Sequence, residues 1–381
     1  MKIEFCMGTP EDRQDILDFG DLVFSKNGRP HDFQTLLPRL YGPKAVFEPL
    51  HYLVKEDGKI RAMICVLPME YRVGNRTLKC SGVGTVSVHP MTRGRGYMKK
   101  LMAWAMEDMQ KRGEAFSVLG GLRQRYEYYG YTPAGTTLQY SINRDNLRHR
   151  YRGRDFAPVC LSPMTQEQAV AFAASHAQRS IGVVRKEEEF LDILRSWNAV
   201  PYTVLLNEKA VGYFCCSGGH IGELQLDDAS LLPDVLHAIA EQLHVEEISI
   251  PLPAWETALS PELGHLAEDV RITADHNYRI FDFPAIVEAF LTVRAGYTPL
   301  PDGTLSFAIE NGQRFAVTVK DGAPAVSAFD GETPDFHLKA LEAIRLFFAP
   351  EGWREILHAG SNALVRAWFP LPLHTPEPDN C

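Results

Sequence analysis

Arginine and glycine alternate in the four residues Arg93–Gly96, and a segment with helical periodicity begins directly after them. The β-branched and apolar segment from Cys80 to Val88 precedes them and predicts a buried strand. The first N–H groups of a helix lack intrahelical partners, and the helix dipole adds partial positive charge there. Glycines let an anion approach the backbone closely, and arginines supply the opposite charge. The stretch therefore predicts a cradle for a pyrophosphate.

The spacing within this stretch argues against two common phosphate-binding loops. A Walker loop needs Gly-Lys-Ser/Thr, which does not follow Gly96, and a dinucleotide fingerprint needs a third glycine where Lys99 stands. The stretch instead resembles motif A of the GNAT acetyltransferases, Arg/Gln-x-x-Gly-x-Gly/Ala. Arg93 and Gly96 match this motif, and Met98 replaces its small last residue. A basic surface turn before an ordinary helix is the alternative.

The GNAT resemblance implies that acetyl-CoA is the co-substrate and that no metal takes part. It also implies that a backbone N–H at the end of the strand, that of Val88, stabilises the oxyanion of the reaction. The residues implied for cofactor binding are Val86, Ser87, Val88, Arg93, Gly94, Arg95, Gly96, Tyr97, Met98 and Gly121.

Four tyrosines fall within the six residues from Tyr126 to Tyr131. A short helix that contributes aromatic side chains to the core explains such a run without any chemistry. The run also resembles the pattern Tyr-x-x-Phe/Tyr-Gly-Tyr of the Eis (enhanced intracellular survival) family of acetyltransferases. This resemblance implies that Tyr126 protonates the departing CoA thiolate, with Tyr129, Gly130 and Tyr131 in supporting positions.

The chain ends in a proline-rich segment, residues 367–381, whose four prolines favour a stiff, extended conformation. In the Eis family the terminal carboxylate enters the N-terminal active site and acts as the base. The resemblance assigns that role to the main-chain carboxylate of Cys381, and a loose tail is the alternative. His89 is a second candidate base, although a histidine beside Pro90 at a strand end is more typical of a structural residue.

Composition limits the possible partners and location of the protein. The formal net charge of -9 argues against a general nucleic-acid binder, whose surface would be basic. The sequence shows no apolar run typical of a signal peptide or a membrane span. The seven cysteines are scattered, which is typical of reduced thiols in a cytoplasmic protein. We therefore expect neither a nucleic acid nor a membrane as partner.

The order of predicted elements indicates an α/β protein of three domains. Residues 1–150 carry the helix, antiparallel hairpins, Gly/Arg turn and helix of a GNAT fold. Residues 151–283 repeat this order, because Tyr202–Cys215 echoes the strand–turn–strand pattern of Tyr52–Cys65. Asp227 and Asp228 replace the cradle there, which indicates a degenerate second copy.

Residues 284–381 resemble the sterol-carrier-protein-like domain of Eis proteins, followed by the tail. A helix is predicted at 335–348, and the arginine-rich segment 144–154 is predicted to be a surface linker.

These features favour an acetyl-CoA-dependent N-acetyltransferase that acts directly, through a ternary complex, on a small-molecule or peptide amine. Aminoglycoside-like and lysine-type amines are both open, and the Eis resemblance implies a homohexamer. Two alternatives stay open: a non-catalytic module that binds acyl-CoA or lipid, and a longer-chain N-acyltransferase like the two-copy N-myristoyltransferases. Phe24 and Trp368 are candidates for the acceptor pocket and equally for the core.

Overall fold

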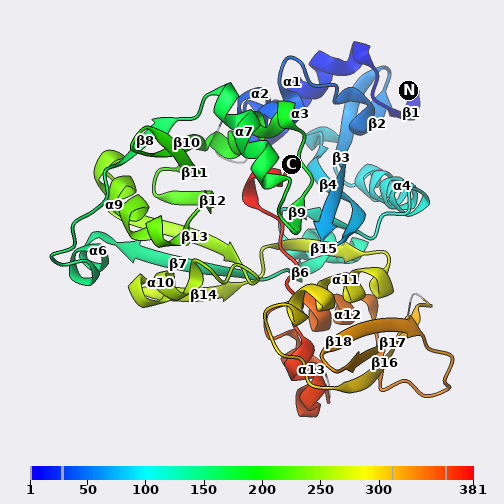
Figure 1. Cartoon of the computed structure of the whole chain (residues 1–381). Helices are drawn as coiled ribbons and strands as arrows, with labels where there is room; N and C mark the ends of the chain where they lie inside the picture. The colour runs from blue at the N-terminus through cyan, green and yellow to red at the C-terminus, as the bar shows by residue number, and fades with distance from the viewer. Residues whose placement is uncertain (1, 27–29, 311, 357) are drawn as a thin grey trace.

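The computed structural model describes residues 2–26, 30–310, 312–356 and 358–381, whose strands form three β-sheets. The first sheet, in blue and cyan, lies beside the second sheet, in green, and the third sheet lies below the first (Figure 1). Within the described ranges, every helix is too short or too polar to span a lipid bilayer. The predicted α/β class, with two tandem units followed by a third domain, is confirmed.

The first sheet has eight strands among the described residues, and the predicted buried strand 80–88 is the second part of one long strand, β4. Its strands in spatial order are β1 (Ile3–Met7), β2 (His51–Glu56), β3 (Lys59–Val73), β4 (Arg76–Val88), β5 (Phe116–Leu119), β15 (His276–Ile280) and β6 (Thr132–Ala134), with β9 (Ile181–Val183) paired to β3.

Neighbouring residues of a strand point to opposite faces of the sheet. Apolar residues lie on both faces of this sheet, and helices cover each face. Helix α1 packs on the face that carries Leu53, Met63 and Cys65. Helix α4 packs on the face that carries Val54 and Ile64, as its predicted apolar stripe requires. The helices of this region are α1 (Arg13–Ser25), α2 (Phe33–Leu36), α3 (Pro38–Tyr41), α4 (Tyr97–Lys111) and α5 (Arg123–Tyr126).

The second sheet repeats the strand order of the first, as the sequence echo predicts. In each copy a long antiparallel pair is followed by a parallel neighbour, β5 beside β4 and β13 beside β12. Its strands in spatial order are β14 (Asp269–Thr273), β7 (Thr137–Asn143), β13 (Glu247–Pro253), β12 (His220–Leu226), β11 (Lys209–Ser217), β10 (Val200–Leu206) and β8 (Val159–Pro163). Its helices are α6 (Arg144–Arg150), α7 (Gln166–His176), α8 (Phe190–Leu194), α9 (Leu232–Gln242) and α10 (Ser260–Leu266).

The predicted boundaries at residues 150 and 283 do not separate the two sheets. Strand β7 precedes the first boundary but pairs with β13 and β14 in the second sheet. Strand β15 precedes the second boundary but lies between β5 and β6 in the first sheet. The two copies therefore exchange strands, which a local pattern of residue types does not reveal because it carries no information about pairing partners.

The arginine-rich segment 144–154 is not the predicted linker. Its first part is helix α6, which Asn143 caps by accepting from the N–H of Asn146. The arginines are used in ion pairs that join this helix to the second copy: Arg144 pairs with Glu241, and Arg150 pairs with Glu262.

The third sheet and its helices form the C-terminal domain. The predicted helix 335–348 begins later, at Ala340, because residues 336–338 form a strand parallel to β16. Trp368 is fully buried in this domain's core, where its indole N–H donates to the carbonyl of Pro301, so it is a core residue. The elements are α11 (Phe283–Ala295), β16 (Gly303–Ile309), β17 (Arg314–Lys320), β18 (Ala323–Ala328), β19 (Phe336–Leu338), α12 (Ala340–Phe348) and α13 (Ala363–Trp368).

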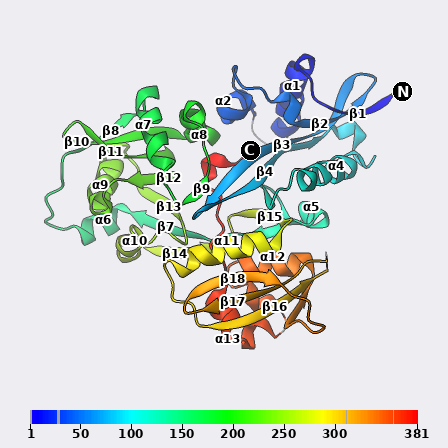
Figure 2. The ribbon, with the colours of Figure 1, turned by 45° about the vertical axis from the view of Figure 1, so that its right-hand side comes forward.

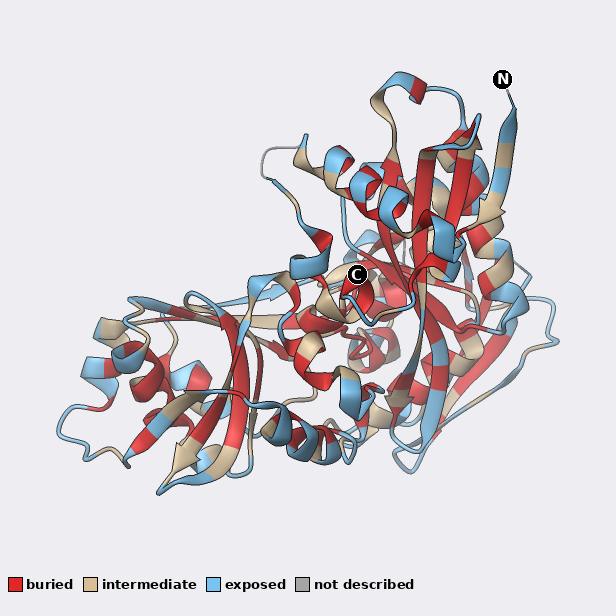
Figure 3. Cartoon of the chain, turned by 90° about the horizontal axis from the view of Figure 1, so that it is seen from above, coloured by how far each residue is buried: buried red, intermediate tan, exposed pale blue. Residues whose placement is uncertain are grey.

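The C-terminal tail leaves the third domain and runs between the first two sheets (Figures 1 and 2). The hydroxyl of Tyr71 on β3 donates to the carbonyl of His374 at 2.5 Å, and the N–H of Thr136 donates to the carbonyl of Leu373. Seen from above, the terminus lies at the centre of the molecule among buried segments (Figure 3). The tail is therefore a packed element of the fold.

Candidate active site

An opening in the first sheet lies where its central strands part. Strands β4 and β5 pair in parallel from Cys80 and Phe116 to Val83 and Leu119. Strand β5 ends there, whereas β4 continues to Val88. The last five residues of β4 therefore have no strand partner on the β5 side. Their backbone groups on that edge are available to a ligand.

A bulge at the start of this free edge is held by buried polar groups. Opposite Met63–Cys65, strand β4 contains one extra residue, and Thr85 has a φ of 43°, which is rare for a β-branched side chain. The Thr85 hydroxyl bonds to the hydroxyl of Tyr41 at 2.9 Å, which bonds to His51 Nε2 at 3.1 Å. Sequence reasoning missed these three residues, since isolated polar residues in apolar segments give no signal of their own.

The direction of this hydrogen-bond chain follows from its far end. The Nδ1 of His51 lies 2.8 Å from the carbonyl of Phe47, which can only accept, so Nδ1 carries the proton. The Nε2 then accepts from Tyr41, and the oxygen of Tyr41 accepts from Thr85. Burial lowers the pKa of His51 to about 4, which keeps the ring neutral as this arrangement requires.

The predicted cradle lies between this free edge and α4. Gly94 and Gly96 have positive φ angles of 83° and 76°, and a Cβ at either position would meet no heavy atom within 4 Å. Among the described residues no side chain caps the N-terminus of α4, so the first N–H groups of this 15-residue helix have no capping partner there. The loop thus offers free N–H groups beside open space, which fits a pyrophosphate.

The two arginines of the cradle differ in their contacts. Arg93 is exposed, and its side chain forms no ion pair with any described residue. Arg95 pairs with Glu56 at 2.6 Å, and Glu56 also accepts from the hydroxyl of Tyr97 at 2.5 Å. This hydrogen bond, together with Arg95, lowers the pKa of Glu56. Arg95 and Tyr97 therefore hold the loop against β2 through Glu56. Arg93 is the arginine of the loop that is available to a ligand.

Tyr126 lies against the loop that follows β5. Its ring fills the space beside Gly121, where a Cβ would come within 2.8 Å of a ring carbon. Burial raises the pKa of Tyr126, and its hydroxyl has no hydrogen-bond partner among the described residues. Tyr131, in contrast, is fully buried and bonds to Ser117 at 2.6 Å. Within the tyrosine run, Tyr126 thus has a protonated, unused hydroxyl, whereas Tyr131 is structural.

The C-terminal residue lies directly on β4 beside the opening. A Cβ on Gly84 would come within 2.5 Å of the carboxyl carbon of Cys381, and one on Gly82 within 2.7 Å of its Sγ. Burial raises the pKa of the Cys381 thiol to about 11, so the thiol is protonated at neutral pH. Cys381 packs with the α1 face of the sheet and Tyr126 with the α4 face. The two predicted catalytic groups therefore flank the sheet on either side of the opening.

A groove of about 1020 Å³ is lined by residues of α3, β3 and β4, and Cys381 is not among its lining residues. Met69 and Leu67 of β3 line it, and a Cβ on Gly82 would lie 3.4 Å from the methyl group of Met69 and beside the Cys381 thiol. Its charged lining consists of the basic residues Arg39, Lys44, Lys79, Arg112 and Lys186 and the acidic residues Glu70, Glu114 and Glu189.

Two other positions singled out in the sequence, His89 and Lys99, have structural partners. His89 accepts the N–H of Met91 on its Nδ1 and stacks on Phe19, as expected for a structural residue. The Nζ of Lys99 lies 5.2 Å from the ring centre of Tyr128, which stabilises the exposed tyrosine by a cation–π contact. The described residues contain no group of three or more His, Cys, Asp or Glu that could hold a metal ion.

The second copy carries carboxylates at the start of the corresponding helix, α9, and at the 3-10 turn Ala229–Leu231 before it. A side-chain oxygen of Asp228 accepts the N–H of Ser230 at 2.8 Å, and Pro233 has no N–H to offer in the first turn of α9. Asp234 accepts from the N–H of Ala157 and from Arg154. Carboxylates thus occupy the place that a phosphate would need.

Comparisons with known proteins agree with this geometry. Residues 7–134 match the family model of the acetyltransferase (GNAT) domain. The chain is similar in structure to Eis1 from Mycobacterium abscessus, at 19% identity and a TM-score of 0.66 over 100% of this chain and 99% of that chain. It is also similar to a GCN5-related N-acetyltransferase from Anabaena variabilis, at 17% identity and a TM-score of 0.69 over 98% of each chain.

A third similar structure is a probable N-acyltransferase from Enterococcus faecalis, at 17% identity and a TM-score of 0.62 over 89% of this chain and 86% of that chain. At these identities the likeness to solved structures is one of fold. No curated protein matches the chain.

Proposed function

Since residues 7–134 form a GNAT acetyltransferase domain and the whole chain has an Eis-like fold, we propose that this acyltransferase moves the acetyl group of acetyl-CoA onto an amine in a ternary complex. One observation carries the proposal: the terminal residue lies against Gly84, where β4 and β5 part, in the copy that has an open cradle. A module that only bound CoA would have no use for a carboxylate beside the opening between β4 and β5.

The cradle's own residues would hold the co-substrate. The free N–H groups at the start of α4 and the guanidinium of Arg93 are placed for the pyrophosphate. The free edge of β4, from Val86 to Val88, is placed for the pantetheine arm and the thioester. The N–H of Val88 would donate to the oxyanion, which is the role that GNAT enzymes give to this position.

Two groups would handle the protons. An amine attacks a thioester only when neutral, yet a lysine-type amine has an ordinary pKa of about 10.4. The carboxylate of Cys381 would accept the proton that the ammonium gives up, directly or through a water molecule. Tyr126 would donate its proton to the CoA thiolate as the carbon–sulfur bond breaks, since its raised pKa keeps it protonated.

The groove beside Met69 is the proposed entry of the acceptor. With five basic and three acidic side chains in its lining, it does not favour a polycation over an amine that also carries a carboxylate. The acceptor panel should therefore pair polycationic amines, such as aminoglycosides and polyamines, with amino acids and acidic peptides. The homohexamer is also a proposal, and light scattering of the full chain tests it.

The decisive experiment measures CoA release from acetyl-CoA with each amine of this panel, and titration calorimetry measures CoA binding in parallel. Turnover with at least one amine, and acetyl-CoA as the best donor, is the expected result. Binding of CoA without turnover of any amine would instead indicate a non-catalytic module. Faster turnover of a long acyl-CoA than of acetyl-CoA would indicate a longer-chain acyltransferase.

A further inference from the structure

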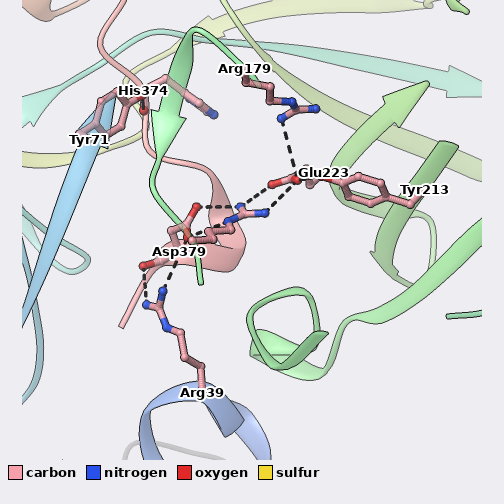
Figure 4. A network of polar contacts seen from close by, with 8 residues as sticks. Arg39, Tyr71, Arg179, Tyr213, Glu223, His374 and Asp379 are labelled. Atoms are coloured by element: carbon pink, nitrogen blue, oxygen red, sulfur yellow. Dashed lines mark hydrogen bonds and ion pairs between the residues drawn. The ribbon is translucent and has the colours of Figure 1, made fainter. Parts of the chain in front are cut away.

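A buried network of charges holds the C-terminal tail onto the second copy (Figure 4). The guanidinium of Arg185 lies between two carboxylates. It donates to Asp379 of the tail, at 2.8 Å and 3.1 Å, and to Glu223 of β12, at 2.5 Å and 3.0 Å. The three side chains are at most 6% exposed. Each contact is a bidentate, charge-assisted pair of fixed geometry.

Three further residues extend the network, and one of them, Arg179, has its guanidinium 4.0 Å from the carboxylate of Glu223 (Figure 4). The hydroxyl of Tyr213 on β11 donates to Glu223 at 2.5 Å. Arg39 on α3 donates to the backbone carbonyl of Asp379 at 3.4 Å, and its guanidinium lies 3.7 Å from the Asp379 carboxylate. Asp379 thus joins the tail to helix α3 of the first copy directly and, through Arg185, to strand β12 of the second copy (Figure 4).

The network is charged despite its burial. Burial alone would lower the pKa of Arg185, but Asp379 and Glu223 raise it well above its ordinary value. Removing two or more charges from water costs free energy that the pairing roughly recovers, so such a network is weak evidence of a role in stability. It does fix the position of Asp379, because a displaced tail loses the bidentate pair with Arg185 and the contact with Arg39.

The position that the network fixes is that of the terminal carboxylate. Only Asn380 separates Asp379 from Cys381, and two residues span at most about 7 Å of extended chain. The terminal carboxylate therefore cannot leave the surface of Gly84 by more than a short distance while Asp379 is held. Chain ends are normally disordered, whereas here the network holds the last residues in one position.

The surface that holds the tail is the counterpart of the first copy's opening. Strands β12 and β13 pair in parallel only at His220 and Ser249. In front of them, Glu377 of the tail bonds to His220 at 2.6 Å, and a Cβ on Gly222 would lie 3.5 Å from the same carboxylate. In the first copy the corresponding strands part to leave an opening, whereas here the tail packs across them.

We propose that the second copy is the docking site of the tail, and that Arg185, Glu223 and Asp379 are positioning residues for the terminal carboxylate. This inference rests on the proposed function, in which that carboxylate serves the acetyl transfer. The degenerate copy thus takes part in the reaction without binding the co-substrate or the acceptor.

The test is Asp379→Ala, which leaves Arg185 paired with Glu223 and so removes one tail contact without stranding a buried carboxylate. We expect kcat to fall roughly 10- to 100-fold, as for a misplaced catalytic group, while the KM for acetyl-CoA changes by less than about twofold. The second readout is alkylation of Cys381 by iodoacetamide, followed by mass spectrometry of the C-terminal peptide. Release of the tail exposes this thiol and should speed its alkylation at least about tenfold.

Two controls make the test specific. Glu377→Gln removes the other tail carboxylate, whose pair with His220 is about half exposed, and should lower kcat and speed the alkylation of Cys381 less than Asp379→Ala does. Asp379→Asn keeps the shape of the side chain and serves if the alanine variant does not fold, as judged by circular dichroism.

The outcomes separate the two proposals. Slow turnover together with rapid alkylation of Cys381 is the expected result. Alkylation as slow as in the wild type would overturn the docking proposal and leave the role of the terminal carboxylate intact. Rapid alkylation with an unchanged kcat would overturn the positioning role and also remove the terminal carboxylate from the proposed reaction.

Discussion

The two copies of the GNAT fold in this chain differ most at one turn. In the first copy, two glycines with positive φ precede a helix whose first N–H groups have no capping side chain. In the second copy no glycine precedes the helix: Asp228 stands at the 3-10 turn Ala229–Leu231, where it accepts the N–H of Ser230, and Pro233 removes an N–H from the first turn of α9. Strand order, bulge and helix placement are similar in both copies.

This difference teaches that the anion site belongs to the turn and not to the fold. The same strand–turn–helix unit offers a pyrophosphate cradle where glycines leave open space beside the first N–H groups of the helix. Aspartates at the corresponding turn add negative charge, and Pro233 removes one N–H, so both changes disfavour a phosphate in the second copy. The second copy has in turn gained a contact with the tail.

The largest expected effect concerns a group that only the first copy has. Tyr126→Phe removes the unused hydroxyl and keeps the ring that packs against Gly121. We expect kcat to fall about 10²- to 10⁴-fold, the usual contribution of a positioned acid, with little change in CoA affinity. Steady-state kinetics and calorimetry measure the two quantities. Tyr128→Phe, at an exposed ring, is the matched control, and a full rate in Tyr126→Phe would return Tyr126 to the core.

The next largest effect concerns the position of the terminal carboxylate, at the end of the tail that lies between the two copies. Adding a few residues after Cys381 moves the carboxylate away from Gly84, and we expect a loss of about 10²-fold in rate with the fold intact. Cys381→Ala keeps the main-chain carboxylate and should retain most of the rate. Both proteins are compared in the CoA-release assay. Equal, wild-type activity in both would exclude the terminus from the mechanism.

A smaller effect is expected on CoA binding, which should involve the cradle of the first copy and not the corresponding turn of the second copy. Arg93→Ala removes the exposed cation and should weaken CoA binding about 10- to 100-fold, the range for a charge-assisted hydrogen bond. Arg95→Ala should weaken it less, because Arg95 already pairs with Glu56. Calorimetry should give one CoA per chain for the wild type and for Asp228→Ala alike. Two CoA per chain would contradict the assignment of the second copy as degenerate.

The smallest effect concerns the exposed pair between the tail and the second copy. The hydrogen bond that His220 donates to Glu377 raises the pKa of His220, so the pair's charged form contributes stability at pH values below this raised pKa and above the lowered pKa of Glu377. The contribution is lost as the pH rises through the pKa of His220. Because the pair is about half exposed, we expect less than about 1 kcal/mol. The melting temperatures of wild type and Glu377→Gln should therefore converge as the pH rises, and a difference that grows would contradict this.

Local features of the first copy could be predicted from the sequence because they depend on neighbours in the chain. The strand 80–88, helix α4 and the glycine turn follow from periodicity and from the positive φ that glycine allows. The echo between the copies predicted the second sheet in the same way. The resemblance of the tyrosine run and the tail to the Eis family added Tyr126 and Cys381 as candidates.

Long-range contacts could not be predicted, because nothing in a local pattern states which distant residue will pair. Glu56 captures Arg95 from 39 residues earlier in the chain, and Tyr41 supports Thr85 from 44 residues away. The pair of Arg185 and Asp379 spans 194 residues. The exchange of β7 and β15 between the sheets is of the same kind, since each strand has an ordinary pattern that fits either sheet.

The position of β15 between β5 and β6 also sets the order in which the protein can be built. During synthesis the GNAT unit lacks an inner strand until residue 280 has left the ribosome, so its sheet stays incomplete while the whole second copy is translated. Until then β5 presents an unpaired edge, which is a template for aggregation. An expression fragment that stops near residue 150 keeps this defect permanently. A fragment with a complete first sheet must therefore carry His276–Ile280 in addition to the N-terminal unit.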